Sequence, residues 1–161
     1  MEKLLKIGMA ELDSACHPCM LTTLGLGSCV GIALYDSITK ISGLAHIMLP
    51  SSLQAINNSN TAKFADTAIV KLVDDMIKLG ACKSNIKAKL AGGAQMFNFS
   101  QSADIIRIGY RNVVSSKEKL EELGIPIIAE DTGGSYGRTI ELYSDDGRLV
   151  IKTVGHGVKQ I

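Results

Sequence analysis

Apolar residues along the chain fall into short runs separated by polar turns, a pattern typical of strands in a packed sheet. Residues 30–35 are apolar throughout, as expected of a strand that is covered on both faces. After a polar turn at 36–40, residues 41–49 form a second apolar run that ends at Pro50. The pattern therefore predicts a hairpin over residues 30–49, preceded by strand-like stretches at 4–10 and 20–24.

The middle of the chain changes to helical spacing. Between residues 64 and 77 the apolar positions recur every three or four residues. Asn60 or Thr61 is available as an N-cap, and Gly80 follows the last turn. A second helix is predicted over residues 111–123, because Gly124 and a proline follow it.

Strand character returns in the second half of the chain, and an Asp-Gly step between its last two apolar runs favours a tight hairpin turn. The predicted strands are 86–90, 125–129, 139–143 and 149–154. No repeat, low-complexity tract or linker divides the chain. The sequence therefore predicts a single α/β (or α+β) domain over residues 1–161.

Charge and composition narrow the class of protein. The chain has 17 lysines and arginines against 16 aspartates and glutamates, and its formal net charge is +1. The lack of a basic surplus argues against nucleic acid or an anionic membrane as a partner. The first residues lack the apolar core of a signal peptide, and no apolar run approaches about 18 residues. We expect a cytoplasmic protein with no membrane insertion.

Cys29 and His46 are the candidate catalytic pair. His46 follows Cys29 by seventeen positions, and the predicted hairpin between them suits the return of the histidine to the thiol. Both are also ordinary core residues, because free cysteine is often buried and a lone histidine on an apolar strand usually packs in the core. Gly27 and Ser28 precede the thiol in a glycine-rich turn, which can expose backbone N–H groups as an oxyanion hole. Both a cysteine–histidine enzyme and a structural pair fit this pattern.

The remaining cysteines and glycines suggest less chemistry. Cys16-His17-Pro18-Cys19 has the C-x-x-C spacing of redox and zinc sites, but a strand is predicted after it and a fourth zinc ligand is missing. The glycine-rich segments lack the spacing of nucleotide-binding loops. We therefore predict no cofactor and no metal, a loop at residues 16–19, and a buried Cys82 that fills the core.

Six segments, in order along nearly the whole chain, together resemble CheD, the family of bacterial chemoreceptor glutamine deamidases. They are TLGLGSC (23–29), AHIMLP (45–50), KFADTA (63–68), AKLAGGAQMF (88–97), IGYRN (108–112) and DTGGSYGR (131–138). The resemblance implies a layered α/β sandwich with a mixed sheet, like the catalytic domain of the cytotoxic necrotizing factor toxins.

The resemblance also assigns roles to three residues. It implies that Cys29 is the nucleophile, that His46 is the general base and acid, and that Thr23 orients the imidazole. The thiolate would attack the side-chain amide of a protein glutamine, with oxyanion support near Gly27 and Ser28, and a thioester would then be hydrolysed to glutamate.

Partners are implied by the same resemblance. The substrates would be methyl-accepting chemoreceptors, and hydrolysis of glutamyl methyl esters would use the same attack. CheC, a phosphatase of the response regulator CheY, would be a binding partner. A second class of function stays open, namely a non-catalytic docking module that regulates chemoreceptors and CheC. Full cellular effect of a Cys29→Ala variant would favour that module.

Overall fold

The two apolar runs at the start of the predicted sheet do form a hairpin. The structure is a computed structural model that describes residues 2–53, 55–96 and 107–161. In it β4 (Val30–Asp36) and β5 (Ile41–Ile47) pair antiparallel, with Val30 opposite Ile47 and Asp36 opposite Ile41. Nearly every residue of the two strands is buried, which confirms a sheet region covered on both faces.

These strands lie in the middle of the first of two five-stranded sheets. We call it sheet B, and its strand order is β2 (Leu12–Cys16), β5, β4, β6 (Ile86–Gly92) and β7 (Ile127–Thr132). Sheet A has the order β1 (Lys3–Lys6), β3 (Cys19–Leu26), β8 (Arg138–Tyr143), β9 (Leu149–Thr153) and β10 (Gly157–Gln160). Both sheets are mixed, because β1 runs parallel to β3 and β7 runs parallel to β6.

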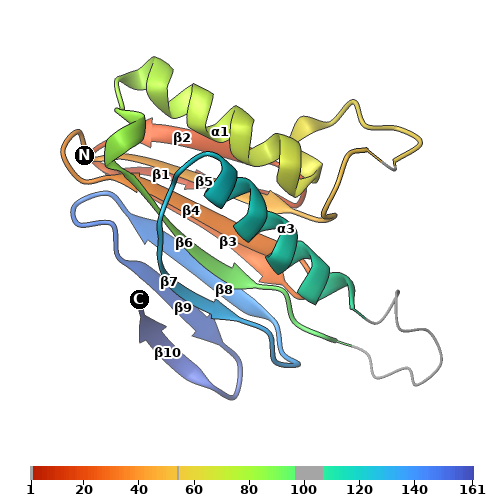
Figure 1. Cartoon of the computed structure of the whole chain (residues 1–161). Helices are drawn as coiled ribbons and strands as arrows, with labels where there is room; N and C mark the ends of the chain where they lie inside the picture. Colours follow the sequence, from red (N-terminus) through yellow and green to blue (C-terminus); the bar gives the residue numbers. More distant parts are fainter. Residues whose placement is uncertain (1, 54, 97–106) are drawn as a thin grey trace.

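Two helices cover the outer face of sheet B. Helix α1 (Ala65–Leu79) packs on β5 and β2, and α3 (Ile108–Glu122) packs on β4, β6 and β7 (Figure 1). One apolar core lies between the helices and sheet B, with Leu72 and Leu120 among its members, and a second lies between the two sheets, with Leu26 and Leu44. The result is a layered α/β sandwich, as predicted. Neither these helices nor the short ones of the described residues are long and apolar enough to cross a membrane.

The predicted helices are confirmed with small shifts at their ends. Asn60 caps a short 3-10 helix, η1 (Thr61–Lys63), that leads into α1, and Gly80 ends α1 in the left-handed conformation at a φ of 118°. Helix α3 begins three residues earlier than predicted. A second short 3-10 helix, η2 (Lys83–Asn85), leads into β6.

Three strands and one cysteine differ from the sequence-based expectation. Strands β2 and β10 were not predicted, because both are edge strands with few buried side chains. Conversely, the predicted strand at 4–10 is confined to β1. Cys82 was expected to be buried and this was wrong: it is exposed just before η2, and its Sγ lies 3.1 Å from the Ser84 hydroxyl.

The Cys16-His17-Pro18-Cys19 segment joins the two sheets. Cys16 ends β2 in sheet B and Cys19 begins β3 in sheet A, so the loop predicted at residues 16–19 is confined to His17 and Pro18. A strand follows the motif, as expected. One further prediction, the last residue of the segment matched at 88–97, lies outside the described residues.

Candidate active site

The hairpin register brings Cys29 and His46 to the same face of sheet B. Gly31 of β4 lies opposite His46 of β5, and Cys29 is two residues before Gly31, directly before the start of β4. Side chains two residues apart on a strand point to the same side, so the thiol and the imidazole are diagonal neighbours across the hairpin. This side faces sheet A, because Cys29 belongs to the core between the two sheets.

Thr23 of β3 reaches the imidazole from sheet A. Its hydroxyl oxygen lies 2.7 Å from His46 Nδ1, and the same hydroxyl donates to the carbonyl of Ile7 at 2.7 Å. A threonine hydroxyl has a single proton, and the carbonyl of Ile7 can only accept it. His46 Nδ1 must therefore carry the proton that it shares with Thr23. The tautomer that results leaves His46 Nε2 with a free lone pair.

Burial keeps both reactive groups neutral at rest. His46 is 1% exposed, and burial lowers its pKa to about 4. Cys29 is 7% exposed, and burial raises the pKa of its thiol, although a hydrogen bond from its own backbone N–H favours the thiolate. Within the described residues His46 Nε2 has no hydrogen-bond partner. The arrangement is therefore a neutral thiol near an unprotonated, unsatisfied imidazole nitrogen, with no preformed ion pair.

The backbone before and at Cys29 is held through its carbonyl groups. The carbonyl of Gly27 accepts from Ala94 N–H at 2.8 Å, and that of Cys29 accepts from Gly93 N–H at 2.8 Å. The carbonyl of Ser28, between them, accepts from a side chain, Asn112 Nδ2, at 2.9 Å. Three consecutive peptide units at the thiol are thus fixed.

The N–H groups of the same segment differ in what they contact. The Gly27 N–H donates to the carbonyl of Gly25 at 3.1 Å, so Gly27 supports the turn and is not a spare donor. The N–H groups of Ser28 and Cys29 donate to no carbonyl within the part of the chain that the structure describes. The Ser28 N–H is available beside the thiol for a developing oxyanion, and the Cys29 N–H, which favours the thiolate at rest, becomes available once the sulfur forms a bond to the substrate.

Gly92 permits the close packing behind Cys29. Its φ is 109°, and a Cβ on it would lie 2.3 Å from the Cys29 carbonyl oxygen, so only glycine fits here without a shift of the backbone. The Gly92 carbonyl accepts from Gly133 N–H and from the guanidinium of Arg138. Arg138 is 2% exposed and forms an ion pair with Asp131 at 3.1 Å.

Sequence reasoning assigned no role to Asn112 or Arg138. Both lie in segments that carry the family resemblance, at 108–112 and 131–138, which was the only available signal. Cys29, His46, Thr23 and Ser28 were all named from the sequence. In the structure Thr23 contacts His46 directly, and Cys29 lies on the same face of sheet B as His46.

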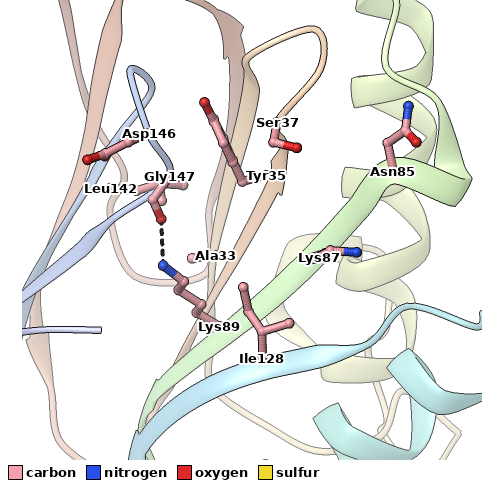
Figure 2. Close-up of a pocket in the computed structure, with 10 residues that line it drawn as sticks. All are labelled: Ala33, Tyr35, Ser37, Asn85, Lys87, Lys89, Ile128, Leu142, Asp146 and Gly147. Carbon is pink, nitrogen blue, oxygen red and sulfur yellow. Dashed lines mark hydrogen bonds between the residues drawn. The ribbon is translucent and has the colours of Figure 1, made fainter.

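A cavity elsewhere in the molecule is not part of this cluster. It has a volume of about 260 Å³ and lies at the other end of β4, where Tyr35 and Ser37 line it (Figure 2). Lys89 points into this end of the sandwich and donates to the carbonyls of Gly147 and Ile161 at 2.9 and 2.8 Å. Cys29, His46 and Thr23 do not line it.

Comparison with known proteins identifies relatives of this fold and sequence. Residues 48–153 match the family model described as CheD chemotactic sensory transduction. A protein of Caldanaerobacter subterraneus named "Probable chemoreceptor glutamine deamidase CheD" is 59% identical over 159 residues, which cover 99% of this chain and 98% of that protein. Proteins of the same name from Lachnoclostridium phytofermentans and Clostridium novyi are 53% and 57% identical, over 100% and 98% of this chain and 100% and 97% of their own lengths.

Among solved structures, the hypothetical protein YfiH of Bacillus licheniformis is similar over 75% of this chain and 49% of that chain, with a TM-score of 0.48 and 15% sequence identity. The matches to the three curated relatives extend over residues that the family model leaves out, including Thr23, Cys29 and His46.

Proposed function

The chain belongs to the CheD family, and on that premise we propose that it deamidates glutamine side chains of chemoreceptors, with Cys29 as the nucleophile. The overall reaction is glutamine side-chain amide plus water to glutamate plus ammonia. The observation that supports it most directly is the contact of Thr23 with His46, which leaves the imidazole Nε2 unprotonated on the face that it shares with Cys29.

In the first half of the reaction, the thiol attacks the amide carbon. His46 Nε2 takes the thiol proton as the sulfur–carbon bond forms, and the amide oxygen becomes an oxyanion. The N–H of Cys29, with that of Ser28, donates to this oxygen. The protonated imidazole then gives its proton to the departing nitrogen. Ammonia leaves, and a thioester joins Cys29 to the substrate.

In the second half, water replaces the thiol. His46, neutral again, accepts a proton from water as its oxygen attacks the thioester carbon, and the proton then returns to the leaving sulfur. The product is a glutamate side chain, and the enzyme regains its thiol. Thr23 takes no proton in this scheme: it keeps the His46 proton on Nδ1 throughout, so Nε2 always faces the reacting atoms.

A chemoreceptor fragment tests this proposal directly. Incubation of the protein with a cytoplasmic receptor fragment should produce a mass gain of about one dalton per converted glutamine, because –NH2 becomes –OH. Cys29→Ala should abolish the gain, and His46→Ala should reduce it nearly as far, since nucleophile and base act as a unit. A mass gain that persists in Cys29→Ala would refute the mechanism. No gain with wild type, in the presence of receptor binding, would favour the docking module.

Two finer activities rest on the family resemblance. Glutamyl methyl esters would be hydrolysed by the same attack, with methanol as the leaving group instead of ammonia.

CheC would dock on the enzyme and limit its access to receptors, which implies a cytoplasmic location. Exposed apolar side chains near the site suit a protein surface. Leu24 next to Thr23 is 68% exposed, and Met96, whose side chain would lie 3.2 Å from a Cβ at Gly27, is 44% exposed. A titration with CheC that leaves deamidation unchanged would refute its docking at this surface.

A further inference from the structure

Asn112 connects the helical layer to the segment that carries the nucleophile. It lies in the first half of α3, and its side chain is fully buried. Its amide nitrogen donates one hydrogen to the carbonyl of Ser28 at 2.9 Å and the other to the carbonyl of Met48 at 3.0 Å. Ser28 directly precedes Cys29, and Met48 follows His46 by two residues. One amide thus joins the two chain segments from which the reactive side chains project.

The position of this amide depends on a close approach of α3. Gly109 is three residues before Asn112 and on the same face of the helix. A Cβ at Gly109 would lie 2.4 Å from the carbonyl oxygen of Ala94, so the glycine allows the helix to rest on the Gly93-Ala94 backbone. Because of this contact the Asn112 side chain can reach Ser28.

The side-chain amide of Asn112 uses both of its N–H donors. Its acceptor, Oδ1, is buried without a hydrogen-bond partner among the described residues. Burial of an unsatisfied polar atom is costly, so an apolar residue would suit this place better if packing alone mattered. The two N–H bonds are therefore what the asparagine supplies.

A held carbonyl at Ser28 determines the direction of the Cys29 N–H. The peptide unit is planar and trans, so the C=O of Ser28 and the N–H of Cys29 point in opposite directions. With its carbonyl drawn toward α3, this peptide presents the Cys29 N–H away from the helix. Within the described residues, no other donor contacts the Ser28 carbonyl oxygen.

We propose that Asn112 is a positioning residue, which holds the peptide between Ser28 and Cys29 so that the Cys29 N–H faces the amide oxygen of the substrate. This inference rests on the proposed function. His46 does not depend on Asn112 to the same degree, because its backbone N–H donates to the Glu11 carbonyl at 3.0 Å and Thr23 holds its ring. Loss of the amide should therefore disturb oxyanion stabilisation more than thiol reactivity.

The test compares three variants of the full chain. Asn112→Ala and Asn112→Ser remove the amide and retain small, neutral side chains. The matched control is Ser116→Ala, which removes a buried hydrogen bond one turn further along α3, from the Ser116 hydroxyl to the Asn112 carbonyl at 2.7 Å. Folding is checked by circular dichroism. Deamidation of the receptor fragment gives kcat and KM, and the rate at which iodoacetamide alkylates Cys29 is followed by peptide mass spectrometry.

The expected result is a fall in kcat of roughly 10- to 100-fold in both Asn112 variants, with little change in KM. Ser116→Ala should retain wild-type kcat. Alkylation at a saturated carbon develops no oxyanion, so its rate at Cys29 should change by less than about threefold. Equal kcat in the Asn112 variants and the control would overturn the proposal, and so would an alkylation rate that falls in parallel with kcat. Activity in Cys29→Ala would instead refute Cys29 as the nucleophile, and absence of deamidation by wild type would refute the proposed function itself, whatever the Asn112 variants do.

Discussion

Burial of a neutral imidazole at His46 should make the fold sensitive to mild acid. Burial lowers the His46 pKa from about 6.5 to about 4, so the folded protein resists protonation that the unfolded chain accepts. The unfolded state then binds more protons between these values. The stability due to the neutral imidazole is complete above the unfolded pKa, falls as the pH decreases through 6.5, and is lost once the pH reaches about 4.

The size of the effect follows from the difference in pKa. One pKa unit corresponds to about 1.4 kcal/mol, so a depression of this size amounts to about 3 kcal/mol in total. About 2 kcal/mol of it should be lost between pH 7.5 and about pH 5, before most carboxylates titrate. This is a large share of the stability of a typical domain, which is about 5–15 kcal/mol. His46 is 1% exposed, so solvent screening does not reduce the effect much.

Urea unfolding of wild type and His46→Asn at the two pH values measures this loss. The asparagine amide can still donate to Thr23 from near the position of Nδ1, but it does not titrate. Other groups with lowered pKa, such as Asp36, are common to both proteins and cancel in the comparison. Wild type should lose about 2 kcal/mol more than the variant. An equal loss in both proteins would mean that His46 is not held neutral by burial, and the reasoning would fail.

Substitutions at three further positions test the supports around the site. Thr23→Val removes the acceptor for His46 Nδ1 and should lower kcat by roughly 10- to 100-fold. Thr23→Ser keeps the hydroxyl and should retain most activity. An equal loss of kcat in both variants would contradict an orienting role of the hydroxyl. Gly92→Ala places a Cβ against the Cys29 carbonyl and should reduce the free energy of unfolding by about 1–3 kcal/mol, measured by thermal or urea unfolding. An unchanged stability would refute the close packing of Gly92 on Cys29. Arg138→Met removes a buried guanidinium from Asp131 and from the Gly92 carbonyl, whereas Lys159 still pairs with Asp131 at 2.9 Å. The substitution should cost about 1–3 kcal/mol in urea unfolding, and an unchanged stability would contradict a buried ion pair.

Local patterns in the sequence predicted the elements whose side chains are most buried. The apolar run at 30–35 and the helical spacing of apolar residues from Phe64 to Met76 are patterns among neighbours along the chain. They therefore placed β4 and α1 correctly. Strand β2 was missed, because an edge strand with a single buried residue, Ala15, has a weak hydrophobic period. Cys82 was misplaced for a related reason: the burial of one residue beside a turn depends on how the turn sits on the sheet.

The candidate site was predictable to the extent that it is local. The spacing of Cys29 and His46 predicts a hairpin contact, whereas the role of Thr23 came from resemblance to a family. Asn112 contacts carbonyls that are 84 and 64 residues away along the chain, and Arg138 contacts the carbonyl of Gly92 across 46 residues. No periodicity in a single sequence encodes such pairs, because they form only when α3 and sheet A are packed on sheet B.

The use of a hydroxyl where many catalytic triads have a carboxylate is consistent with the burial of this site. A carboxylate next to His46 would put a charge into the space between the sheets, where desolvation is costly, and would raise the pKa of the imidazole. Thr23 avoids both effects, because its one proton is committed to the Ile7 carbonyl and its oxygen can only accept from Nδ1. The tautomer is thus set by neutral groups alone. In the proposed mechanism, a neutral thiol, a neutral base and a neutral amide substrate can then meet without buried charge. Charge appears only as the thiol attacks, where the backbone N–H of Cys29 can stabilise it.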